Sequence, residues 1–238
     1  MIEQTAADSL PSEHPDNPPI ADNDAPGVLR GEVWLTVQSR HASRLILGRA
    51  QTLDKPAIIG LVGFADQLRV IWNAARADDP YADWWLIKID EALDCARTRI
   101  KTERAFLDDR IAQQSALQIN VATTEKPHRV ALHFANPYAY WGAHVIAEFD
   151  TTARTILTSK HVGLISGVLA EASLRGCARA IRRLFTVPQR YRMLGIDRET
   201  ILAGGAVAKK AIDSMGELPE AVLLGETKAA LTPRKAQR

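Results

Sequence analysis

The chain has 238 residues, and its 30 Lys and Arg side chains against 28 Asp and Glu leave a formal net charge of +2. A chain of this length can bury one large hydrophobic core or two small ones. Its longest nearly unbroken apolar runs, AIIGLVGFA and VGLISGVLA, fall well short of the about 20 residues that a membrane-spanning helix needs, so no membrane partner is expected.

Charge is unevenly distributed along the chain. Residues 1–26 contain six acids and no Lys or Arg, which leaves 30 basic and 22 acidic side chains, a net of +8, on residues 27–238. Five prolines and few large apolar side chains predict a disordered acidic tail over residues 1–27. We expect one folded domain over residues 28–225 and a flexible basic tail over residues 226–238. A basic folded domain favours an anionic partner.

A strand is predicted at residues 32–38, EVWLTVQ, where apolar residues alternate with the others. Side chains alternate across a strand, so the apolar residues can be buried together on one face. The opposite face carries Glu32, Trp34, Thr36 and Gln38. One interpretation is an edge strand with a solvated outer face. The other is a two-stranded ribbon formed with the same strand of a second chain, because such a ribbon fits a DNA major groove and Thr and Gln can bond base edges.

Two helices are predicted after this strand. The first covers residues 40–47 and is closed by Gly48, and the second runs from about residue 57 to residue 77 with Pro56 in its first turn. Together with the strand they form a strand–helix–helix unit.

Basic side chains and glycines surround these two helices. Arg40 and Arg44 lie four residues apart and can face phosphates together, and Lys55 is close by. Gly60 and Gly63 allow an anion to approach the start of the second helix. Close helix packing is the alternative interpretation of both glycines.

A long helix is predicted from Asp79, which can cap it, and Pro80, which can start it. Its apolar residues recur at spacings of three and four, at Leu86, Ile89, Leu93, Ala96 and Ile100. Such a stripe indicates a fold core or, alternatively, a coiled-coil seam between subunits.

Three alternating segments and three helices follow. Strands are predicted at residues 117–122, 129–134 and 144–149. Helices are predicted at residues 152–159, 164–186 and 198–213, the last with Asp197 as its cap. The order strand, short helix, glycine-containing loop and longer helix occurs at residues 32–77 and again at 144–186, so a second strand–helix–helix unit is one open interpretation.

An arginine stripe occurs on the helix predicted at residues 164–186. It consists of Arg175, Arg179, Arg182 and Arg183. A solvated helix face is the common interpretation, but such a face usually mixes Glu with Lys. Arginine suits geometric recognition of phosphate or carboxylate, so the stripe also fits a nucleic acid or an acidic partner.

Signatures of enzymes and metal sites are missing from the sequence. It contains no P-loop, GxGxxG after a strand, HExxH or GxSxG, and its histidines show no zinc spacing with Cys95 and Cys177. Tyr191 lies among arginines, as in a tyrosine recombinase, but a buried tyrosine fits better. We therefore expect no catalytic residues, metal or cofactor. The two separated cysteines and the lack of a basic-then-apolar leader predict a cytoplasmic protein with free thiols.

A family resemblance rests on the segments SRHASRLILGRA, KPAIIGLVGFA, DDPYADWWLIKI and GELPEAVLLGET, in this order. From about Leu29 to Thr227 the chain resembles the integrating conjugative element proteins grouped with AcaB-like transcriptional regulators. The resemblance implies a non-enzymatic, ribbon-helix-helix type DNA-binding protein that acts as a homodimer. It also implies a place at the nucleoid and control of transfer genes on a conjugative element.

The expected fold class is α+β and mainly α-helical. A ribbon-helix-helix-like strand–helix–helix core would be elaborated by the long helix, a small antiparallel sheet and C-terminal helices. The residues expected to contact double-stranded DNA are Trp34, Thr36, Gln38, Arg40, Arg44, Lys55, Arg175, Arg179, Arg182 and Arg183. The expected partners are DNA, a second copy of the chain and other conjugative-element proteins. The alternative function is an accessory or scaffold protein of the conjugation machinery that binds an acidic protein.

Overall fold

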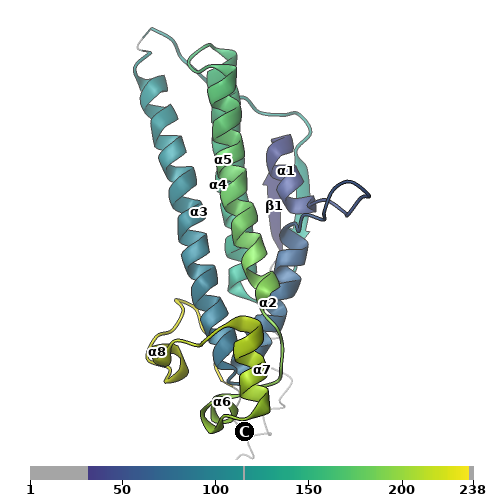
Figure 1. Ribbon diagram of the computed structural model, residues 1–238. Coiled ribbons are helices and arrows are strands. Elements are labelled where there is room, and N and C mark those ends of the chain that lie inside the picture. The colour runs from purple at the N-terminus through teal and green to yellow at the C-terminus, as the bar shows by residue number, and fades with distance from the viewer. Residues whose placement is uncertain (1–31, 115, 236–238) are drawn as a thin grey trace, which may run out of the picture. The chain divides into compact units, whose positions relative to one another are not determined.

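The computed structural model describes residues 32–114 and 116–235, so the predicted acidic tail over residues 1–27 lies outside the described residues. The described part is mainly helical with one small sheet (Figure 1), which confirms the expected α+β class. In chain order the elements are β1 (Val33–Val37), α1 (Arg40–Leu47), α2 (Leu61–Arg76), α3 (Pro80–Ala112), β2 (His128–Leu132), α4 (Pro137–His161), α5 (Gly167–Thr186), the 3₁₀ turn η2 (Val187–Arg190), α6 (Arg198–Ala203), α7 (Ala206–Met215) and α8 (Glu220–Leu223).

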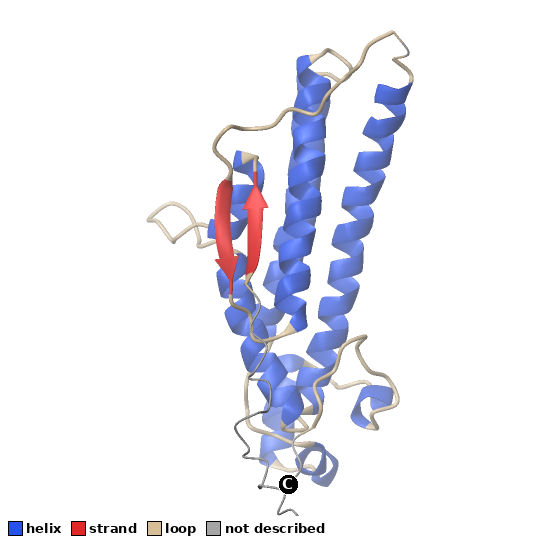
Figure 2. Ribbon diagram, turned by 180° about the vertical axis from the view of Figure 1, so that it is seen from behind, coloured by secondary structure: helices blue, strands red, loops and turns tan. Residues whose placement is uncertain are grey.

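Three long helices, α3, α4 and α5, pack side by side and hold most of the core (Figures 1 and 2). The predicted stripe of α3 is buried within the chain, including Leu86, Ile89 and Ala96 at 0% exposure. The stripe is therefore part of the fold core, and the coiled-coil alternative does not apply to it. None of the helices in the described part of the chain is both long and apolar enough to cross a membrane.

Side-chain caps begin the helices that the sequence predicts best. The Asp79 carboxylate accepts the backbone N–H of Tyr81 at 2.8 Å, and Pro80 occupies the first turn of α3. Ser39 caps α1, and Gly48 ends it with a φ of 66°. Both predicted starts are confirmed, and α1 covers the predicted residues 40–47.

Helix α2 begins at Leu61, later than predicted. Ile58 and Arg49 pair instead through an isolated β-bridge, with both N–H···O distances at 2.8 Å. Gly60 then passes so close to α1 that a Cβ there would lie 2.4 Å from the Ile46 carbonyl oxygen. The close-packing interpretation of this glycine therefore holds.

The sheet is a two-stranded antiparallel ribbon made of β1 and β2. Val33 lies opposite Leu132 and Val37 opposite His128. β2 confirms the strand predicted at 129–134, beginning one residue earlier. The ribbon thus forms within one chain, which corrects our expectation that it requires the same strand of a second copy. The homodimer itself stays a prediction.

Two predicted strands are wrong. Residues 117–122 form no strand. At the end of this segment α4 side chains bond the backbone of Ala122, whose N–H donates to Thr158 Oγ1 at 3.0 Å and whose carbonyl accepts from Arg154 Nε at 2.8 Å. Residues 144–149 lie inside α4, as does the short helix predicted at 152–159.

The start and the spacing of α4 explain the second error. Asn136 accepts the Ala139 N–H at 3.0 Å and Pro137 follows in the first turn, so this Asn-Pro pair starts a helix and not a turn between strands. The buried apolar residues follow helical spacing at Val145, Ile146, Phe149, Ala153 and Ile156. The proposed second strand–helix–helix unit at 144–186 consequently begins with a helix.

The C-terminal part is more divided than predicted. Gly204 and Gly205 adopt φ values of 72° and 97°, which splits the helix predicted at 198–213 into α6 and α7. Part of the segment predicted as a flexible basic tail contacts the bundle, since the Ala230 N–H donates to Asp90 at 2.6 Å and the Leu231 N–H to the Tyr138 hydroxyl at 3.2 Å.

Candidate functional site

One face of the β1–β2 ribbon is exposed. This face carries Trp34, Thr36 and Arg129, and we call it the outer ribbon face. Leu35 and Val37 point inward and are 6% and 1% exposed, whereas Trp34 is 44% exposed. Thr36 lies opposite Arg129 in the register. In Figure 2 the sheet lies in front of α1, which packs behind it. The alternation in the sequence therefore predicted the face correctly.

Arg129 is the residue of this face that sequence reasoning missed. Its guanidinium carbon lies 4.3 Å from the centre of the Trp34 ring, in a cation–π contact. Trp34 Nε1 also donates to Glu32 Oε2 at 3.1 Å. Trp34 is thus held by its neighbours and acts as a platform for a cation. The alternation of Arg129 with Val130 in the predicted second strand was the available signal.

Gln38 is turned toward the chain itself. Its Oε1 accepts the Thr124 N–H at 3.1 Å, and its own backbone N–H donates to Asp150 at 2.9 Å. The structure therefore places Gln38 at the end of the ribbon, half-buried, as a brace for the segment before β2.

Arg40 and Arg44 lie on α1, one turn apart and exposed to solvent. Burial lowers the pKa of the neighbouring His41, and the charge of Arg44 lowers it further. The positive charge of α1 near neutral pH therefore comes from its arginines.

Lys55 is part of an exposed loop that the Arg49–Ile58 bridge closes. The Arg49 guanidinium donates to the Pro56 carbonyl at 2.9 Å and fastens the base of this loop. Leu53 near its tip is fully exposed. In Figure 1 the loop projects from the body beside α1, on the side of the sheet.

The predicted arginine stripe lies on α5, but its members divide into two pairs. Arg179 and Arg183 line a groove between α3 and α5, together with Arg99, which sequence reasoning missed. Arg175 is exposed and lies 3.4 Å from Glu171 of its own helix, and Arg182 is half-buried. A helix rotates by about 100° per residue, which turns Arg175 and Arg182 away from the groove.

The outer ribbon face and the α5 arginines are on different sides of the bundle. Helix α5 is in front in Figure 1, and the sheet is in front in Figure 2, which is seen from behind. The structure thus brings together Trp34, Thr36 and Arg129, with α1 directly after them in the chain, and separates them from α5.

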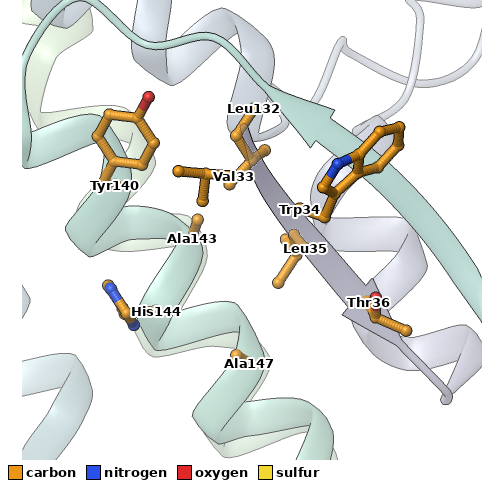
Figure 3. A pocket seen from close by; sticks show the side chains of 9 residues that line it. All are labelled: Val33, Trp34, Leu35, Thr36, Leu132, Tyr140, Ala143, His144 and Ala147. Atoms are coloured by element: carbon orange, nitrogen blue, oxygen red, sulfur yellow. The ribbon is translucent and has the colours of Figure 1, made fainter. Parts of the chain in front are cut away.

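A hollow of about 300 Å³ lies at the edge of β1 that β2 does not pair (Figure 3). Val33 and Thr36, from opposite faces of the strand, both line it, which places it at the strand's edge. His144 and Ala147 of α4 form its other wall. The hollow gives another chain segment access to the open edge of β1.

Metal ligands are not grouped in this part of the molecule. Among the described residues no set of three or more His, Cys, Asp or Glu side chains could hold a metal ion. The candidate site consists of exposed polar, aromatic and cationic side chains, and cationic side chains of this kind can form charge-assisted hydrogen bonds with anions.

The comparisons with known proteins define the class more narrowly, as a transcriptional regulator. The family model described as Transcriptional regulator AcaB matches residues 25–235, so the chain belongs to the AcaB family and the resemblance read from the sequence is confirmed. Among solved structures, selenomethionine-containing AcaB from uropathogenic E. coli is similar, with a TM-score of 0.54 and 12% identity over 82% of this chain and 95% of that chain. At this identity the similarity concerns the fold. Comparison with curated proteins gave no match.

Proposed function

We propose that this AcaB-family regulator binds double-stranded DNA with the outer ribbon face in the major groove. The observation that supports this proposal is a strand pair whose inner face is buried and whose outer face exposes Thr36, Trp34 and Arg129. A two-stranded ribbon fits a major groove about 12 Å wide, where Arg bonds guanine and Thr bonds base edges or packs on thymine methyl groups. Sequence preference would therefore reside in Thr36 and Arg129.

Phosphate contacts come, in this proposal, from Arg40, Arg44 and Lys55. Ser39 caps α1 directly after β1, so both arginines follow the ribbon within two helical turns. Phosphate contacts position a protein on the duplex but carry no sequence information. Gln38, whose side-chain oxygen already accepts a backbone N–H, is here a brace and not a base reader.

The first experiment maps the protein on the genome and then measures affinity for the recovered operator and for random DNA across salt concentrations. Thr36→Ala should cost about 1–3 kcal/mol on operator DNA and little on random DNA. The double variant Arg40→Gln/Arg44→Gln should weaken both and reduce the salt slope by about one unit per lost phosphate contact. Lys209→Gln/Lys210→Gln, which removes the same charge from exposed positions on α7, is the matched control.

Two outcomes would overturn the DNA proposal. Equal affinity of the parent and Thr36→Ala for operator DNA, with unchanged selectivity, rejects the ribbon as the reading element. Absence of any retarded DNA at low salt favours the alternative from the sequence, a scaffold protein of the conjugation machinery that uses the α5 arginines to contact an acidic protein. Sites that cluster at transfer genes would support the role on a conjugative element, and sites elsewhere would contradict it.

A homodimer is the second part of the proposal. The hollow beside the open edge of β1 can receive a side chain or loop of a second copy, so that the two ribbons stay separate and each can enter its own stretch of major groove. Ala147→Arg fills the hollow from α4 without changing β1, whereas Ala172→Arg places the same side chain at an exposed position on α5. Sedimentation should show a dimer for the parent and Ala172→Arg and a monomer for Ala147→Arg. A dimer in all three rejects this edge as the interface.

A further inference from the structure

The groove between α3 and α5 is a second site, separate from the ribbon. It encloses about 520 Å³ and is lined by Arg99, Arg179 and Arg183 above an apolar floor that includes Leu184 and Val187. Cavities of about 300–1,000 Å³ with an apolar lining and a few polar groups are typical of small-molecule sites. The three guanidinium groups are the polar groups of this one.

Arg99 is held in place at the groove by its neighbours. Its Nη2 lies 2.9 Å from Glu103, whose side chain is 8% exposed. Gly176 of α5 gives it room, because a Cβ there would lie 3.0 Å from Arg99 Nη2. A larger residue at position 176 would require the Arg99 guanidinium to shift by a few tenths of an ångström.

Arg179 and Arg183 have no acidic partner among the residues that the structure describes. Two guanidinium groups one helical turn apart repel each other, and a solvated helix face normally places an acid between them. Glu103, one turn beyond Arg99 on α3, does not line the groove and is already bound by Arg99. The groove therefore carries uncompensated positive charge.

Positive charge continues toward the η2 end of α3. Burial lowers the pKa of Lys88; Glu91 raises it, and Arg190 lowers it further, so these groups lie close enough to interact. Lys88 also lies 3.1 Å from the centre of the Trp84 ring.

We propose that this groove binds a small molecule that carries phosphate groups beside an apolar or planar body, of the nucleoside phosphate class. Arginine binds phosphate through two parallel N–H···O bonds and stacks on planar groups. The apolar floor would cover the body of such a ligand, which inorganic phosphate lacks. The site would give this regulator an effector in addition to DNA, and it does not depend on the ribbon proposal.

Occupation of the groove by a ligand can be measured at Cys95, because this exposed thiol lines the groove. The other cysteine, Cys177, is fully buried, and burial raises its pKa to about 11. An alkylating reagent should therefore label Cys95 in the folded protein and leave Cys177 unmodified.

The experiment follows Cys95 alkylation of the full chain by mass spectrometry, with AMP, ATP, GTP or pyrophosphate at millimolar concentration. A ligand present at ten times its Kd should slow alkylation about tenfold. Arg179→Gln/Arg183→Gln should abolish this protection. Arg175→Gln/Arg182→Gln removes the same charge from the same helix outside the groove and should keep it.

Every other outcome overturns the proposal. No protection by any nucleoside phosphate rejects the ligand class, and protection by pyrophosphate alone rejects the role of the floor. Protection only by operator DNA, or by a peptide of residues 1–26, assigns the groove to a macromolecule or to the acidic segment. Equal protection in both double variants marks non-specific binding. Operator affinity measured on the same variants reports separately on the ribbon proposal.

Discussion

Asp150 joins α4 to the junction between β1 and α1, and its removal should affect stability and DNA binding together. The carboxylate is 4% exposed and accepts the backbone N–H groups of Gln38 at 2.9 Å and Ser39 at 2.7 Å. These bonds fix where the ribbon ends and where α1 begins. Asp150→Ala leaves both N–H groups without their acceptor.

The magnitude follows from these two bonds. A hydrogen bond to a charged group contributes about 1.5–3 kcal/mol, and two bonds to one carboxylate are not fully additive, so the free energy of unfolding should fall by about 3 kcal/mol. For a chain of this size 1 kcal/mol corresponds to about 2–4 °C, which predicts a Tm lower by about 6–12 °C. Asp150→Asn keeps one acceptor oxygen and should lose about half as much.

Thermal unfolding followed by circular dichroism tests this prediction. Thr151→Ala is the matched control, because Thr151 is exposed and its hydroxyl, within the described part of the chain, bonds the Ala147 carbonyl of its own helix. Operator affinity of Asp150→Asn should fall at temperatures where the variant is fully folded, since one of the two bonds that fix the junction between Thr36 and Arg40 is lost. A Tm for Asp150→Ala within about 1 °C of the parent would refute the reasoning.

Three further substitutions test the packing of the described unit. Arg198→Met removes the partner of Asp83, whose side chain is 9% exposed, and should cost about 3–5 kcal/mol in urea unfolding, with Arg198→Lys losing less. Burial raises the pKa of Asp79 above its ordinary 3.8, so its contribution to stability declines as the pH rises from 3.8 through the raised value. Asp79→Asn should therefore gain stability relative to the parent as the pH rises above 3.8, and a difference that does not change with pH contradicts this. Gly60→Ala places a Cβ 2.4 Å from a carbonyl oxygen and should lower stability by about 1–3 kcal/mol, whereas Gly167→Ala, whose nearest contact would be 3.6 Å, should leave the Tm unchanged or slightly higher.

Local signals in the sequence were sufficient where a single element carries its own start and its own face. The alternation at 32–38 predicts β1 and its exposed side, and Asp79-Pro80 with the stripe from Leu86 to Ile100 predicts α3 and its buried side. These features depend on neighbours three or four residues away at most.

Features that depend on contacts between residues far apart in the sequence could not be predicted in this way. The partner of β1 is decided by tertiary packing between segments far apart in the chain, and the sequence contains three candidate strands. Residues 144–149 alternate only in part, and the adjacent Val145 and Ile146 fit helical spacing once the Asn136 cap is recognised. The α3–α5 groove joins Arg99 to Arg183, which no local pattern connects.

A ribbon formed within one chain changes what dimerisation does for DNA binding. If two chains shared one ribbon, a monomer would have no reading face. Because β1 pairs with β2 of its own chain, each subunit carries a complete outer ribbon face, and in the proposed dimer the two faces would read two half-sites. Monomeric Ala147→Arg should thus bind a half-site duplex with about half the salt slope of the parent on the full operator, because half the phosphate contacts remain. The Thr36→Ala derivative of this monomer should bind the half-site more weakly by about 1–3 kcal/mol, the same loss of binding free energy as in the dimer. Complete loss of half-site binding by a folded Ala147→Arg monomer would mean that the reading face is assembled between subunits after all.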